Sequence, residues 1–202
     1  MANYRTRKII PIALTLIIVA IAIAALVSLA RAVFFSGTTT TPVISQTEVA
    51  KEALLSSDPE HNVIVTVRGP IVADETFRTY KFQINANVRE LNTYKGYQSQ
   101  PIDKISLGNN IKAYEQFVFS LYRANLVKGT ELPDNQNELR GICATGTVYV
   151  FEVYAHDKDV KRLWTSTCSG SKGSLDASVN QLMGLYKSQI PGSAELISKT
   201  ME

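Results

Sequence analysis

The sequence is poor in the side chains that most often carry catalysis or bind metals. Its 202 residues include two histidines, two cysteines and one tryptophan. His61 and His156 stand far apart, and no H-x-x-x-H, Cys-x-x-Cys or G-x-S-x-G pattern occurs. Zinc centres and serine nucleophiles of the common kinds show such patterns. We therefore expect both histidines to be surface residues, and the protein to have no catalytic activity, no metal and no cofactor.

Acidic residues are absent from the first 47 positions, and this absence decides where the net charge of +3 comes from. Four basic residues stand in that stretch, so the remaining chain carries 17 basic and 18 acidic side chains, a balance of −1. A body without excess positive charge does not attract the nucleic-acid backbone. We expect no nucleic-acid partner.

A hydrophobic run without any charge occupies residues 9–30. As a helix it would reach about 33 Å, which is the thickness of a bilayer core. Three basic residues precede the run and one, Arg31, follows it, and the positive-inside rule then places the N-terminus in the cytoplasm. We expect a single-pass protein of the cell membrane. The alternative is a cleaved signal peptide, although the run is longer than a usual h-region.

The residues after the hydrophobic run predict a spacer that leads to a folded domain. Residues 36–42 read SGTTTTP, a composition typical of an extended linker. Ser45 and Glu48 form a capping box for a short helix that either docks on the domain or belongs to a stalk. The expected organisation is a cytoplasmic tail at 1–8, an anchor at 9–31, a spacer with the short helix at 32–61 and an extracytoplasmic domain at 62–202.

Two kinds of periodicity alternate within the expected domain. Strand-like alternation marks four segments, at 62–68, 76–94, 146–154 and 161–169. Helical spacing marks two segments, at 109–126 with Asn110 as N-cap and at 175–189 with Ser174 as N-cap. The order ββαββα predicts a two-layer α+β fold in which two helices cover one face of an antiparallel sheet. The helices match at an offset of 64 residues, which either a duplication or two similar helices explain.

The two cysteines flank the hairpin formed by the last two expected strands. Outside the cytosol an even number of cysteines favours a disulfide. A tight turn at Asp157 and Lys158 would offset Cys143 from Cys168 by four residues, whereas the bond needs Cα atoms within about 7 Å. We predict the disulfide nevertheless, with a bulge or a bend before Gly146 that brings Cys143 across. Buried free thiols are the alternative.

Aromatic residues on the last hairpin form the candidate binding surface. The helices use one face of the sheet, so the opposite face is free to bind a partner. Tyr149, Phe151 and Tyr154 do not all share one face of their strand, so part of the aromatic surface should be exposed. Tyr149, Phe151 and Trp164 are the candidates, and packing in the core is the alternative for each.

Three segments carry a resemblance to a known group of proteins. They are Ala73-Asp74-Glu75, Arg140-Gly141-Ile142-Cys143 and the run WTSTCSGSKG at 164–173. Together with the basic N-terminus, one anchor and a Thr-rich spacer, they make the chain resemble single-pass surface proteins of ultrasmall episymbiotic bacteria of the Saccharibacteria type. The resemblance implies no activity and no site residue.

These features predict a membrane-anchored extracytoplasmic binding or interaction module without catalytic activity, whose partner is a protein or another envelope component. The alternative is a structural subunit of an envelope assembly, such as a secretion, pilus or division complex, whose anchor contacts partner helices. The hydrophobic run has no G-x-x-x-G and no charge within it. That composition favours a simple tether.

Overall fold

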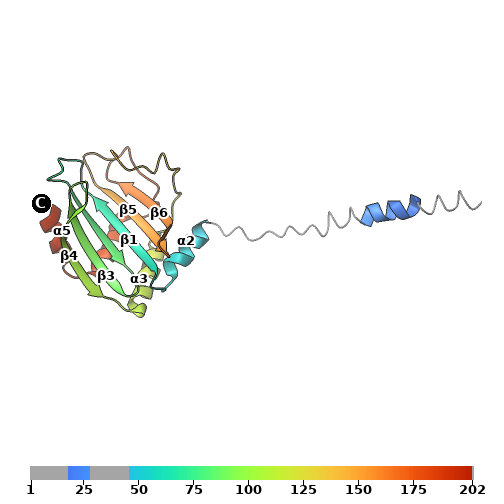
Figure 1. Ribbon diagram of the computed structural model, residues 1–202, viewed down its shortest axis with the longest axis horizontal. Helices are drawn as coiled ribbons and strands as arrows, with labels where there is room; N and C mark the ends of the chain where they lie inside the picture. Colours follow the sequence, from blue (N-terminus) through green and yellow to red (C-terminus); the bar gives the residue numbers. More distant parts are fainter. Residues whose placement is uncertain (1–17, 28–45, 202) are drawn as a thin grey trace, which may run out of the picture. The chain divides into compact units, whose positions relative to one another are not determined.

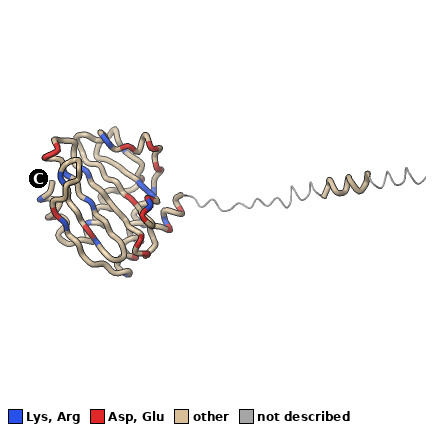
Figure 2. The backbone as a smooth tube through the Cα atoms, in the orientation of Figure 1, with Lys and Arg blue, Asp and Glu red and all other residues tan. Residues whose placement is uncertain are grey.

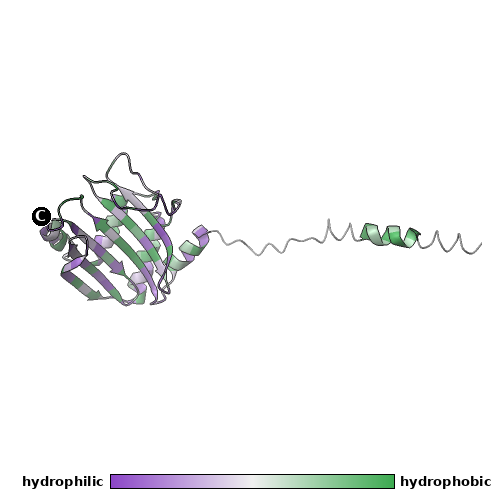
Figure 3. Cartoon of the chain, turned by 45° about the horizontal axis from the view of Figure 1, so that its top comes forward, coloured by the Kyte–Doolittle hydropathy of each residue, from purple (hydrophilic) through white to green (hydrophobic). Residues whose placement is uncertain are grey.

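A computed structural model describes residues 18–27 and 46–201 of the chain (Figure 1). The chain divides into two compact units, 1–43 and 44–202. The described part of the first unit is an apolar helix at 18–27 (Figure 3). Within the described ranges, no helix is both long enough and apolar enough to span a membrane.

Several sequence-based expectations concern residues outside the described ranges. They are the tail at 1–8, most of the anchor at 9–31, the Thr-rich spacer and the cap at Ser45. These expectations stay predictions.

The second unit is built on one six-stranded sheet, in which every pairing is antiparallel. The strands follow the order β4-β3-β2-β1-β5-β6, so β1 is an interior strand between β2 and β5. The strands are β1 His61–Arg68, β2 Arg78–Ile84, β3 Val88–Lys95, β4 Gln100–Gly108, β5 Val148–Ala155 and β6 Lys158–Ser166. The helices of this unit are α2 Gln46–Leu55, α3 Ile111–Arg123, α4 Val179–Gln189 and α5 Ser193–Met201. The predicted α+β class is confirmed.

Alternation along the strands gives the sheet one apolar face. Val65 of β1 lies opposite Phe82 of β2 and Phe151 of β5, and all three side chains are buried. Their sequence neighbours point to the other face because side chains alternate along a strand. The alternating colours of the strands in Figure 3 follow this pattern.

Helices α2 to α5 lie on the apolar face and bury it (Figure 1). Tyr186 of α4 is fully buried near the centre, and its ring lies 5.4 Å from that of Phe117 in α3. The rings of Phe82 and Phe151 lie 6.0 and 6.3 Å from the ring of Tyr186. The core is therefore an aromatic cluster between two helices and two strands of the sheet.

The predicted long strand at 76–94 is wrong, because the chain reverses within it. β2 ends at Ile84 and β3 begins at Val88. The Asn85 side-chain oxygen accepts hydrogen bonds from the backbone N–H groups of Asn87 and Val88, both at 2.9 Å, and this closes the turn. Ala86 is buried within the turn, so the apolar alternation continues through the reversal and conceals it.

Strand β4 was not predicted, because its composition is not that of a buried strand. It is an edge strand with Pro101, Asp103 and Lys104, and most of its residues are exposed. Charge and proline on an edge strand discourage pairing with other chains. The four strands that precede α3 make the predicted order ββαββα wrong, and they remove the proposed ββα repeat.

Four helices, rather than the predicted two, cover the apolar face. α3 begins as predicted, with the Asn110 side chain accepting from Ala113 N–H at 3.0 Å. α4 begins four residues later than predicted and is capped by Ser178. Ser174, the predicted cap, instead accepts a hydrogen bond from the backbone N–H of Trp164 at 3.0 Å. α5 follows α4 directly and was not predicted.

Helix α2 docks on the sheet and is not part of a stalk. Ala50, Ala53 and Leu54 are buried and belong to the main core, whereas Val49 is exposed. Apolar residues at positions i, i+3 and i+4 share one face of a helix, and here that face meets the sheet. Helix α2 thus belongs to the same compact unit as the sheet.

Candidate functional site

The sheet face opposite the helices is the candidate binding face. A representative row across β4, β3, β2 and β1 consists of Lys104, Asn92, Lys81 and Thr66. Charged residues of both signs are spread along the strands (Figure 2). Among the described residues no helix lies on this face (Figure 1), so its β2–β4 half is open and polar.

A loop at 129–147 covers the β5–β6 half of the same face. Beneath it, Val148, Val150 and Trp164 form a second small core with Cys143, and Leu132, Leu139, Ile142 and Cys168 pack around them. Val150 and Trp164 are paired across the two strands. The loop therefore closes a hydrophobic patch that the helices cannot reach.

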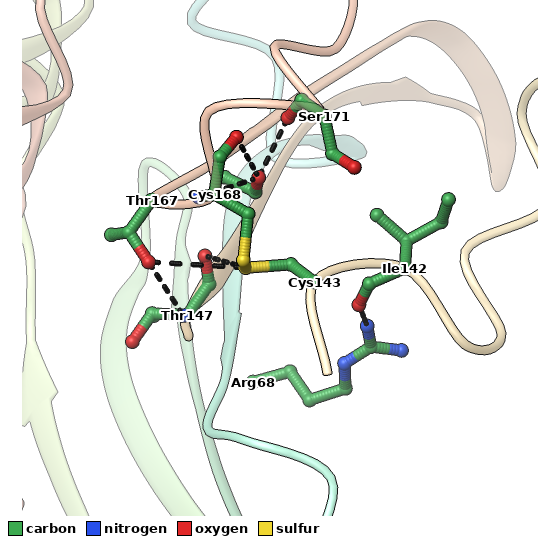
Figure 4. Close-up of a disulfide and its surroundings, with 8 residues drawn as sticks. Arg68, Ile142, Cys143, Thr147, Thr167, Cys168 and Ser171 are labelled. Carbon is green, nitrogen blue, oxygen red and sulfur yellow. Dashed lines mark hydrogen bonds between the residues drawn. A yellow bond between two sulfur atoms is a disulfide. The ribbon is translucent and has the colours of Figure 1, made fainter. Parts of the chain in front are cut away.

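The disulfide between Cys143 and Cys168 fastens this loop to the end of β6 (Figure 4). The two Cα atoms are 5.4 Å apart, as a disulfide requires. Cys143 reaches its partner through a tight turn, in which Gly146 N–H donates to the Cys143 carbonyl at 3.3 Å. The predicted disulfide is thus confirmed, and a bend of the chain before Gly146 brings Cys143 to Cys168.

Gly146 is needed because the disulfide passes directly over it. A Cβ at this position would clash with the hydroxyl oxygen of Thr167, and it would lie 2.8 Å from the Sγ of Cys143 and 3.2 Å from the Sγ of Cys168. Real Cβ atoms essentially never approach other heavy atoms as closely as 2.8 Å. Any larger residue at this position would push the loop away from the sheet.

Two arginines of the sheet hold the loop by its backbone. Arg68 of β1 donates to the carbonyl of Leu139 at 2.8 Å. It also donates to the carbonyl of Ile142 at 2.6 Å (Figure 4). Arg162 of β6 donates to the carbonyl of Asn137 at 3.3 Å. The backbone N–H of Arg162 donates to the Glu131 carboxylate at 2.6 Å. Hydrogen bonds from charged groups are the stronger kind, so the loop is anchored at several points.

A cleft of about 410 Å³ lies beside these contacts. It is lined by Arg68, Asp134, Asn137, Glu138, Leu139, Arg140 and Arg162. Two buried atoms at this place, Arg68 Nε and Asn137 Oδ1, have no hydrogen-bond partner within the described part of the chain. Both atoms are inaccessible to solvent, so the cleft does not present them to a ligand.

The positive charges of the cleft are balanced unequally. Arg162 faces Glu152 at 3.4 Å, and Arg140 faces Glu138 at 2.7 Å. Burial raises the pKa of Glu152, and the charge of Arg162 opposes this rise. Arg68 makes no ion pair with any described residue, and burial lowers its pKa without removing its charge at neutral pH. Arg68 is thus the uncompensated cation of the cleft.

The three predicted aromatic residues do not form an exposed surface. Phe151 is 2% exposed in the main core, and Trp164 is 4% exposed under the loop on the opposite face. Tyr149 is half-buried against the main core, and burial raises the pKa of its phenol. The expectation of an open aromatic face on this hairpin is therefore wrong. The loop at 129–147 occupies that place.

The two histidines are close together in the structure, although they stand far apart in the sequence. His156 is exposed as expected, but His61 is 9% exposed, so the expectation of a surface residue is wrong for His61. The ring centroids of His61 and His156 are 5.2 Å apart. His61 begins β1, His156 follows β5, and these two strands are paired. One carboxylate oxygen of Asp58 and one ring nitrogen of each histidine all lie within 4.8 Å of one another. These three side chains are the group within the described residues that could hold a metal ion.

Comparison with models of known protein families gave no match, and comparison with curated proteins gave none.

Proposed function

We propose that the chain is a membrane-tethered extracytoplasmic binding module without catalytic activity, which binds a protein or another envelope component at the cleft beside the disulfide loop. The observation that carries this proposal is Arg68. It is a partly buried cation that lines the cleft, and it makes no ion pair with a described residue. An acidic group of a partner would supply the missing negative charge.

The disulfide supports a location outside the cytosol, because the reducing cytosol keeps most thiols free. The basic residues before the hydrophobic run support a tether with the same orientation. Neither argument identifies the partner. Both restrict it to molecules that meet the outer side of the membrane.

The dimensions of the cleft limit what enters it. A volume of about 410 Å³ holds one or two side chains and not a folded domain, so the partner should insert an acidic side chain or a chain terminus. The polar β2–β4 half of the face then contacts the surrounding surface. A polar surface that is accessible to solvent is typical of the rim of a protein interface.

A photo-crosslinking residue at Asp134, which lines the cleft, tests the proposal in cells that express the full chain. The matched control carries the same group at Gln116, which is exposed on α3. We expect a defined adduct from position 134 and none from position 116. Arg140→Glu should abolish the adduct, whereas Arg123→Glu on α3 should leave it unchanged.

Equal adducts from both positions would contradict a single binding face. A ladder of adducts between copies of the chain would instead favour the structural-subunit alternative. Adduct formation that survives Arg140→Glu would show that charge in the cleft does not select the partner.

A further inference from the structure

Both histidines of the chain meet Asp58 at the end of the β1–β5 pair, away from the cleft. One ligand atom each from Asp58, His61 and His156 lie within 4.8 Å of one another. The chain has no other histidine. A cluster that collects both of them, and one carboxylate, has the donor types of a transition-metal site.

The backbone holds the cluster in place from two sides. His61 N–H donates to the Asp58 carbonyl at 2.9 Å, which closes the turn between α2 and β1. His156 N–H donates to the Glu60 carbonyl at 3.2 Å, and His61 is paired with Ala155. Ligands fixed by the backbone lose little freedom when an ion binds.

Each imidazole already uses one nitrogen for a contact within the chain. The Nδ1 of His156 is hydrogen-bonded to the Glu60 carboxylate, and the Nδ1 of His61 lies 3.4 Å from the Ser56 hydroxyl. Neither Nε2 makes a hydrogen bond to a described residue. Metal-bound histidines usually have this arrangement, with one nitrogen oriented by a carboxylate or hydroxyl and the other free for the ion.

The charge around the cluster favours a cation. Asp58, Glu60 and Asp157 are exposed carboxylates at this end of the sheet, and Lys158 is the basic residue beside them. Positive surroundings would repel a divalent ion, whereas a surplus of carboxylates attracts it.

We propose that Asp58, His61 and His156 bind one divalent transition-metal ion of the zinc type, with the two imidazoles and one carboxylate as ligands and Glu60 orienting His156. Three protein ligands leave one tetrahedral position for water or for a partner's side chain. Mg²⁺ and Ca²⁺ prefer sites made of oxygen atoms, so this site should not bind them. The site is independent of the cleft and of the proposed function.

The test uses the full chain without a polyhistidine tag, in mild detergent at neutral pH. Titration with ZnCl₂ in a calorimeter should give one equivalent bound, and MgCl₂ should give none. Since the chain has two histidines, its proton NMR spectrum has two imidazole Cε1–H signals, and both should shift as Zn²⁺ is added. The signals should return to their original positions with EDTA.

Variants separate this site from adventitious binding. His156→Ala and Asp58→Asn should each weaken Zn²⁺ binding at least about tenfold, and Glu60→Gln should weaken it by about tenfold through loss of the orienting carboxylate. Asp176→Asn, an exposed carboxylate in the segment before α4, should leave it unchanged. His156 is exposed, so its replacement should preserve the fold, and circular dichroism would verify this. Zn²⁺ binding of wild-type strength in His156→Ala, or unshifted imidazole signals, would overturn the proposal.

Discussion

Loss of the disulfide should destabilise the domain by an amount that follows from the length of the closed loop. Cys143 and Cys168 are 25 positions apart, and the chain-entropy relation then gives about 3.5 kcal/mol at 25 °C for Cys143→Ser with Cys168→Ser. A unit of the length of 44–202 unfolds with an entropy of about 0.33 kcal/mol/K. The double variant should therefore melt about 10 °C below the parent protein.

The fluorescence of the single tryptophan, Trp164, should report on the opening of the loop at 129–147 after the disulfide is removed. Trp164 is 4% exposed and packs beneath the loop that the disulfide fastens. Without the bond, the loop is still held by Arg68 and Arg162, but it should open before the sheet unfolds. Tryptophan fluorescence should shift to the red at a lower temperature than the loss of the far-ultraviolet circular dichroism of the sheet.

Thr145→Ser is a suitable control, because Thr145 is an exposed residue of the same loop. It should change neither transition. A melting temperature of the double variant within about 2 °C of the parent, with both probes still coincident, would refute the argument that the bond constrains the loop. Peptide mapping without reductant should show the linked pair in the parent protein.

The buried aromatic rings and the carboxyl of Glu152 give three further predictions. Phe151→Ala should cost about 3 to 5 kcal/mol in urea unfolding because the ring fills the main core; a cost below about 1 kcal/mol would contradict that packing. Tyr186→Phe should be neutral or stabilising in the same assay, because the hydroxyl is buried without a partner among the described residues; a clear loss would reveal a hidden partner. Burial raises the pKa of Glu152 above its ordinary value, so its contribution to stability should fall as the pH rises through the interval between the two values. Glu152→Gln should consequently be more stable than the parent at pH 7 and lose this advantage at low pH, and a parent-like pH profile in the variant would count against the raised pKa.

Local sequence signals predicted the elements whose ends and faces are encoded nearby. The cap at Asn110 and the helical spacing of Tyr114, Val118 and Leu121 located α3, and alternation located β1, β5 and β6. These signals depend on neighbours a few residues away, and tertiary packing did not override them. Where the period continued through a turn, as at Ala86, the same signal joined two strands into one.

The candidate site depended on contacts between distant residues, and the sequence therefore predicted it poorly. A tight turn at Asp157 and Lys158 would pair Phe151 with Trp164 on one face of the sheet. In the structure Phe151 pairs with Leu163 and Trp164 pairs with Val150, so the two rings lie on opposite faces. Which face is open depends on what covers each one. The loop at 129–147 has few apolar residues, yet Leu132, Leu139 and Ile142 cover Trp164. The Arg68 contacts that position the loop join residues more than 70 positions apart, and no local pattern indicates them.

The histidine cluster could have been predicted from the sequence if the pairing of β1 with β5 had been known. His61 lies at the start of one strand and His156 just after the end of another. In an antiparallel pair the start of one strand meets the end of its partner, so the two histidines become neighbours once β1 is known to pair with β5. In a simple meander, in which sequential strands pair with each other, β1 would be an edge strand and β5 would lie beyond β4, and the histidines would stand far apart. The central position of β1, between a strand that follows it closely and one that follows after α3, is therefore the topological feature that creates the site.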